Sequence, residues 1–197
     1  MSVSKKLAMN SVVQIGGKML SMVIGLVTIK ILTVQLGVSG FGGYTTILNF
    51  LLIFGIIADL GLYIVLTQEI ADKDDEKNNH DVSNIFTLRT ISAITSIVII
   101  GSLIGLLTNY DPEIKRLIAL GGFGMVFMSM AQVFVGVFQT HLRTDYIVVG
   151  EVISRLTLML GVIALSTLGH FNLANVIYIF VFSNFLQFAY TWFGANK

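Results

Sequence analysis

The fold is decided by residues 9–34, which read MNSVVQIGGKMLSMVIGLVTIKILTV. This run is mostly apolar and exceeds the roughly 20 residues that a helix needs to cross a hydrocarbon core of about 30 Å. Five further runs of similar character follow at about 44–67, 85–108, 114–139, 147–168 and 171–193. Because each run is far longer than a β-strand, we predict an all-α integral membrane fold with six transmembrane helices.

The composition supports one membrane domain over residues 1–197. Hydrophobic residues make up 55% of the chain and charged residues 12%, whereas soluble domains average about 25% charged residues. The net charge of +1 excludes a polybasic nucleic-acid binder. The chain has no cysteine, and its three histidines lie far apart, so we expect no metal site, no disulfide and no cofactor.

The connections predict the orientation in the membrane. Residues 35–43 form a short glycine-rich loop, and residues 68–84 form the one strongly charged loop, which we place in the cytoplasm. Asp111, Pro112 and Glu113 predict the cap and first turn of the fourth helix. Basic residues gather on one side, which predicts that both termini are cytoplasmic. That side carries Lys5, Lys6, Lys73, Lys77, Arg143 and Lys197, against Lys115 and Arg116 on the other.

Polar residues align on one face of the first predicted helix. At 100° per residue, Asn10, Gln14 and Lys18 share this face with the small residues of 17–28. A lysine in the middle of the membrane costs about 2.5–3.5 kcal/mol, so we expect this face to be shielded from lipid. Stripes of glycine, serine and threonine are also typical of contacts between packed helices.

The other predicted helices carry further polar candidates. Glu151 and Arg155 are spaced i,i+4, which allows an ion pair within one helix. Arg89 lies near a helix end, where it is a candidate site or an anchor at the membrane surface. Asp59 is a candidate coupling group or a local pairing partner. The remaining candidates are the amides Asn49 and Gln132.

Several short motifs occur in a fixed order along the chain. They are Leu36-Gly37, Gly40-Phe41-Gly42-Gly43-Tyr44, Asp59-Leu60-Gly61-Leu62, Gln68-Glu69-Ile70-Ala71 and Phe138-Gln139 followed by Arg143. In order, spacing and membrane context, the chain resembles bacterial polysaccharide (O-antigen, Wzx-like) flippases. One element departs from the family pattern, because Gln68 stands where an arginine is expected.

The resemblance implies the multidrug/oligosaccharidyl-lipid/polysaccharide exporter superfamily, in which two six-helix lobes enclose a central cavity. The chain would be the N-terminal lobe, completed by a missing C-terminal half or by a homo- or heterodimer partner. The implied activity is flipping of undecaprenyl-pyrophosphate-linked oligosaccharides for lipopolysaccharide O-antigen and other polysaccharide biosynthesis. This activity is transport rather than enzyme catalysis, in the cytoplasmic membrane of a bacterium or archaeon.

A pyrophosphate headgroup brings about two negative charges into a low-dielectric cavity, so cations are its expected partners. Lys18 is the leading candidate, with Arg89 and Arg155 as further cations. The amides of Asn10, Gln14, Asn49 and Gln132 are candidates for binding sugar hydroxyls.

Two alternatives stay open. A multidrug or metabolite cation antiporter would depend on Asp59, and a non-transporting membrane assembly subunit would use the small-residue faces only for association.

Overall fold

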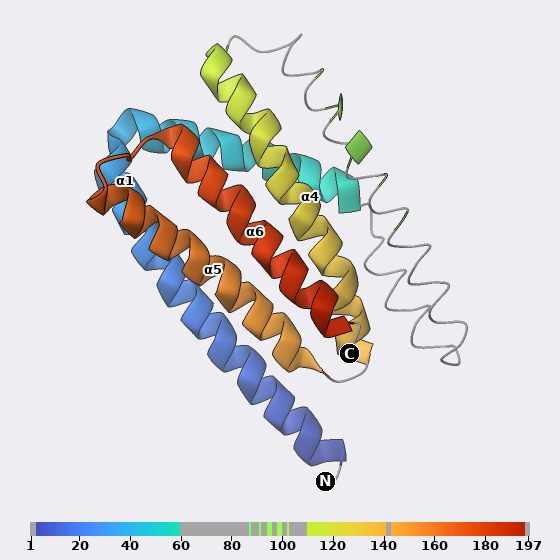
Figure 1. Ribbon diagram of the computed structural model, residues 1–197. Helices are drawn as coiled ribbons and strands as arrows, with labels where there is room; N and C mark the ends of the chain where they lie inside the picture. The colour runs from blue at the N-terminus through green and yellow to red at the C-terminus, as the bar shows by residue number, and fades with distance from the viewer. Residues whose placement is uncertain are drawn as a thin grey trace.

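The computed structural model describes residues 3–59, 110–140 and 143–195, together with residues 87, 91, 94, 95, 98, 99 and 102. Four long helices make up most of the three continuous ranges (Figure 1). They are α1 (Val3–Asp59), α4 (Pro112–Thr140), α5 (Thr144–Thr167) and α6 (Leu173–Ala195). Side chains are described from Ser11 onward, except for 54, 57–59, 136, 137, 139, 140 and 144.

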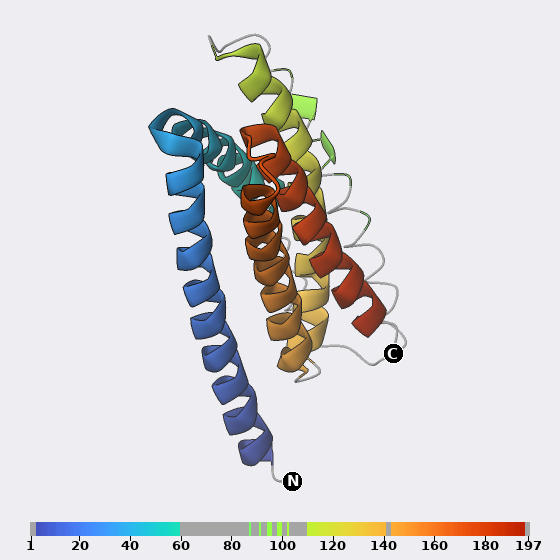
Figure 2. The same ribbon diagram turned by 60° about the vertical axis from the view of Figure 1, so that its left-hand side comes forward.

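Helix α1 covers the first predicted span and the described part of the second, and the loop predicted at 35–43 is wrong because this segment is a kinked helix. The helix continues through this segment and is interrupted by one residue, Gly37, with φ 65° and ψ −175°. This backbone conformation is accessible essentially only to glycine, so one residue can turn the chain without a loop. We refer to residues 3–36 as the first arm and to residues 38–59 as the second arm. Figures 1 and 2 show the change of direction between them.

Among the described residues, four helices rather than six are long and apolar enough to cross a membrane. The difference has two sources. The first two predicted spans are joined in α1, and the predicted span at 85–108 lies mostly outside the described residues, as does the charged loop at 68–84. Helices α4, α5 and α6 occupy the predicted spans at 114–139, 147–168 and 171–193.

Local chemistry fixes the ends of these helices. A side-chain oxygen of Asp111 accepts a hydrogen bond from the backbone N–H of Glu113 at 2.9 Å, which confirms the predicted cap of α4. Gly169 adopts φ 72° after α5, and the His170 N–H donates to the Leu165 carbonyl at 3.2 Å. Asn172 then caps α6 by accepting a hydrogen bond from the Asn175 N–H at 2.8 Å. Helices α5 and α6 are therefore joined by a tight turn and run antiparallel (Figure 1).

The first arm of α1 lies alongside α5 and runs in the same direction (Figures 1 and 2). Gly17 faces Val148 near one end of this contact, so closely that a Cβ atom on Gly17 would overlap the Val148 side chain. At the other end, the Gln35 amide donates a hydrogen bond to the Ser166 hydroxyl at 2.8 Å. This pairing brings together segments that are 131 residues apart in the sequence.

Helix α4 packs against α6 through aromatic rings. The ring centroids of Phe127 and Phe185 are 5.2 Å apart, and those of Phe134 and Trp192 are 5.6 Å apart. Both pairs meet edge to face, the arrangement that the ring quadrupole favours. These contacts hold α4 and α6 together over about two helical turns.

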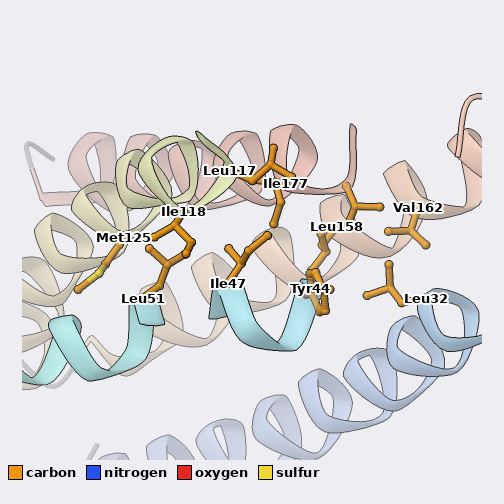
Figure 3. Close-up of a cluster of buried hydrophobic side chains, with 11 residues drawn as sticks. Leu32, Tyr44, Ile47, Leu51, Leu117, Ile118, Met125, Leu158, Val162 and Ile177 are labelled. Atoms are coloured by element: carbon orange, nitrogen blue, oxygen red, sulfur yellow. The ribbon is translucent and has the colours of Figure 1, made fainter. Parts of the chain in front are cut away.

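The second arm of α1 closes the apolar core. Figure 3 shows Ile47 and Leu51 from this arm beside Ile118 and Met125 of α4. Tyr44 of the same arm lies close to Leu158 of α5. The core cluster also contains Leu32, Leu117, Val162, Val176 and Ile177, so all four helices contribute to it.

Candidate functional site

A partly open cavity of about 590 Å³ lies where the second arm of α1 meets α4. This volume falls within the roughly 300–1,000 Å³ that is typical of small-molecule sites. Helices α5 and α6 contribute one lining residue each. The lining residues are Leu48, Leu51, Leu52, Gly55, Ile56, Met125, Met128, Ser129, Gln132, Arg155 and Phe180.

Among the lining residues that the structure describes, most are apolar and three are polar. Ser129 and Gln132 are one helical turn apart on α4, and Arg155 comes from α5. The cavity therefore combines a hydrocarbon-like wall with a permanent positive charge and an amide that can both donate and accept hydrogen bonds. A guanidinium in such surroundings attracts anionic oxygens more strongly than one in water.

Arg155 forms no ion pair with a described carboxylate. Glu151 lies one turn earlier on α5 and is half-buried, yet no ion pair or hydrogen bond joins these two side chains. The i,i+4 spacing is thus present but is not used for pairing in this structure. Arg155 is exposed at the cavity, so its guanidinium is available to a ligand.

The predicted polar face of the first helix is mainly a packing face. Ser21 and Thr28 are 5% and 4% exposed, on the same side of the helix as Gly17, which contacts α5. The Thr28 hydroxyl donates to the Ile24 carbonyl at 2.8 Å, a bond within its own helix. For these residues the packing interpretation is the one that the structure supports.

Lys18 does not line the cavity and is exposed. It lies about 100° around the helix from Gly17, at the edge of the contact with α5. Its apolar neighbours Ile15, Met19 and Met22 are 61%, 65% and 67% exposed. This surface of the first arm is not covered by any described residue, and the binding role of Lys18 stays a prediction.

The other predicted site residues are dispersed. Gln14 is half-buried on the first arm, and Asn49 is exposed on the second arm without lining the cavity. Asn10 and Asp59 belong to α1, but their side chains lie outside the described residues, and Arg89 lies outside them entirely. The structure therefore brings together Gln132 and Arg155 from the predicted set.

The apolar wall of the cavity was not among the residues predicted from the sequence. Glycines in α1 and α4 are the sequence feature that could have indicated it, because they allow these two helices to approach closely. A Cβ atom on Gly55 would lie 2.9 Å from the Met125 methyl group, and one on Gly121 would lie 2.7 Å from a Leu51 methyl group. The second arm and α4 can meet this closely because these positions carry no side chain.

A second cluster lies at the connection between α4 and α5. The Arg143 guanidinium lies 4.4 Å from the centre of the Tyr146 ring, and Phe138 stacks on the same ring at 5.1 Å. The Arg143 N–H also donates to the Phe138 carbonyl at 2.8 Å. The motif residues Phe138 and Arg143 thus meet on Tyr146 and stabilise the end of α4.

Long apolar helices, largely exposed outside their mutual contacts, define a multi-pass membrane protein. The chain belongs to the polysaccharide biosynthesis protein family, which matches residues 7–195. The resemblance drawn from the motifs of residues 36–71 and 138–143 is confirmed at the level of this family. No curated protein and no solved structure matched the chain.

Proposed function

We propose that this chain is one lobe of an exporter that flips undecaprenyl-pyrophosphate-linked oligosaccharides across the cytoplasmic membrane. The family supports a role in polysaccharide biosynthesis. The observation that carries the proposal is the position of Arg155, a cation without a described acidic partner, at a largely apolar cavity. The chain transports its substrate without making or breaking a covalent bond, so we do not propose an enzyme.

The cavity chemistry fits an amphiphilic anion. A phosphate can accept two parallel hydrogen bonds from one guanidinium, which gives Arg155 both charge and directional recognition. The amide of Gln132 supplies a donor and an acceptor for the adjoining phosphate or sugar. The wall formed by Leu48, Leu52 and Ile56 suits the first part of the lipid chain.

We further propose that the exposed surface of the first arm faces a second six-helix lobe. A lysine exposed to hydrocarbon is costly, and Lys18 lies next to the exposed apolar residues of this surface. A second lobe would enclose Lys18 and Gln14 in an aqueous lumen, and rocking of the two lobes would expose this lumen to each side in turn. On this proposal, Lys18→Ala lowers glycan export at normal protein abundance.

The proposed orientation places both termini in the cytoplasm of a bacterium or archaeon. Figures 1 and 2 show the two ends of the described chain toward the same end of the bundle. An even number of membrane crossings produces this arrangement, as the proposed six-helix lobe requires. Protease protection of terminal epitope tags in inverted membrane vesicles tests the side on which they lie.

The test of the cavity is a set of charge substitutions in cells that lack the chromosomal gene. We expect Arg155→Gln to lower export roughly 10- to 150-fold, as loss of charge-assisted hydrogen bonds worth about 1.5–3 kcal/mol implies. Arg155→Lys should retain part of the activity, because lysine keeps the positive charge but cannot donate two parallel hydrogen bonds as the planar guanidinium does. Lys30→Gln is the matched control, since Lys30 is exposed and does not line the cavity.

Surface glycan per molecule of membrane-inserted protein is the measured quantity. Normal export by Arg155→Gln at normal abundance would refute the assigned role of the cavity. A variant that is absent from the membrane reports on folding, so abundance is measured in the same samples.

The two alternatives make different predictions. A cation antiporter needs a carboxylate at its site, whereas the cavity carries a cation among the described residues, and Asp59→Asn with drug-susceptibility profiling tests this alternative. A non-transporting assembly subunit would shield cysteines placed at positions 14, 18 and 49 from impermeant thiol reagents on both sides. Reaction of the cysteines at positions 14 and 18 would instead support a lumen.

A further inference from the structure

We propose that the second arm of α1 is a hinged wall that pivots about Gly37 and opens or closes the cavity. The role of this hinge in transport rests on the proposed function, whereas the arrangement of the two arms does not depend on the substrate. Five cavity-lining residues come from the second arm and none from the first. Movement of this arm alone would therefore change the cavity.

The pivot is one residue with unusual backbone freedom. Gly37 is the non-helical position inside α1, and no atom lies within 4 Å of the place where its Cβ would be. The space around Gly37 itself is therefore open, and glycine can change between positive and negative φ more readily than any other residue. The helices on both sides can then move as rigid bodies.

The two arms are attached to the bundle in different ways. Directly before the pivot, Gln35 is tied to Ser166 of α5 by the 2.8 Å hydrogen bond. On the second arm, Thr45 donates to the carbonyls of Phe41 and Gly42 in its own helix. No described side chain of residues 38–56 forms a hydrogen bond with α4, α5 or α6.

Apolar contacts of this kind give a membrane protein little resistance to separation, because lipid tails are as apolar as the core. A polar bond therefore fixes the first arm directly before the pivot, whereas the described side chains of residues 38–56 contact the other helices without a hydrogen bond. Exposure along the second arm follows the faces of the helix. Ile47 and Leu51 face the bundle and are 0% and 4% exposed, whereas Leu52, Ile53 and Ile56 lie on other sides of the helix and are 57%, 57% and 75% exposed.

A small rotation is sufficient to change the cavity. At 1.5 Å per residue the second arm is about 33 Å long, so a rotation of roughly 10° displaces its far end by about 6 Å. The same rotation moves Ile47, about 15 Å from the pivot, by less than about 3 Å. The buried contacts of Ile47 must repack by this smaller shift, while the far wall formed by Leu52, Gly55 and Ile56 moves away from α4.

The cysteine-free sequence allows this motion to be measured directly by pulsed electron–electron resonance. Spin labels on Ile56→Cys and Phe123→Cys report the distance between the second arm and α4, and both sites are exposed. Labels on Val34→Cys and Leu160→Cys report the first arm against α5 and form the matched control pair. The full chain is reconstituted in phospholipid vesicles for both pairs.

We expect the 56–123 pair to give a broad or two-peaked distance distribution and the 34–160 pair to give one narrow peak. Gly37→Ala should change the 56–123 distribution and leave the 34–160 distance unchanged, because alanine disfavours the observed backbone conformation. Gly42→Ala is the control for the glycine substitution, since Gly42 is helical and nothing lies within 4 Å of its Cβ position. A 56–123 peak as narrow as the control peak, or one insensitive to Gly37→Ala, would overturn the hinge.

A transport experiment then separates the hinge from the proposed function. Cross-linking Leu51→Cys to Gly121→Cys with a short thiol reagent fixes the second arm to α4, and we expect it to abolish glycan export. Cross-linking Gly17→Cys to Val148→Cys fixes the first arm to α5 and should leave export intact. Export that is unaffected by the 51–121 cross-link would refute the hinge. Absence of export by the unmodified chain would instead refute the proposed function, and the distance measurement alone would then decide on the hinge.

Discussion

The contact between Gly17 and Val148 gives the sharpest test of the packing between α1 and α5. A Cβ atom on Gly17 would overlap the Cγ1 atom of Val148 and lie 3.2 Å from its Cβ. Gly17→Ala therefore forces a shift of a helix or of the Val148 backbone, since Val148 has one side-chain rotation and no flexible end. Overpacking of this kind costs about 1–3 kcal/mol.

The neighbouring glycine supplies an internal control for this prediction. Gly16 is helical and exposed, and no atom lies within 4 Å of its Cβ position. Both Gly16→Ala and Gly17→Ala gain the same helix propensity, about 0.8–1.0 kcal/mol, so this contribution cancels in their difference. We expect Gly17→Ala to be less stable than Gly16→Ala by about 1–3 kcal/mol.

Reversible unfolding in mixed detergent micelles measures four variants, which are Gly16→Ala, Gly17→Ala, Val148→Ala and Gly17→Ala/Val148→Ala. The double variant removes the overlapping methyl groups, so the cost of Gly17→Ala should fall when it is measured in the Val148→Ala background. A coupling of at least about 1 kcal/mol between the two positions is expected. Equal stability of Gly16→Ala and Gly17→Ala, or additivity in the double variant, would refute the close approach of these helices.

Three further predictions concern single side chains, with the same unfolding measurement. Ser21→Ala should change stability by less than about 1 kcal/mol, because the buried Ser21 hydroxyl has no hydrogen-bond partner among the described residues. A loss above about 2 kcal/mol would contradict this. Asp111→Ala should cost about 1 kcal/mol through the cap of α4, and Asp111→Asn should restore most of it. Ile118→Ala should cost about 2–5 kcal/mol because Ile118 is fully buried in the core cluster, whereas Ala119→Gly on the exposed side should cost only about 1 kcal/mol.

Local signals in the sequence predicted the local features well. The cap of α4 depends on Asp111, Pro112 and Glu113. Because these residues are consecutive, the cap can be predicted without knowledge of the fold. The glycines of residues 37–43 were less informative, because the same composition suits a loop or a helix with one pivot residue. The distinction depends on the backbone angles of Gly37, which packing of the two arms decides.

The candidate site was predictable only in part, for a similar reason. Helical periodicity places Ser21, Thr28 and Lys18 on one face, but it does not say whether that face meets another helix or a lumen. The structure shows α5 against the small residues and leaves Lys18 exposed. Gln132 and Arg155 lie on different helices, so their convergence at the cavity follows from tertiary packing and not from spacing in the sequence.

The pairing of Gln35 with Ser166 has a consequence for biosynthesis, because the ribosome makes these residues 131 positions apart. At about 5–20 residues per second, the helix that begins the chain must wait roughly 7 to 26 s before its neighbour is synthesised. During this interval Ser21 and Thr28, which α5 later covers, face lipid or the insertion machinery. Nascent chains stalled before residue 148 should therefore retain the first helix beside the translocon, and release should coincide with the emergence of α5.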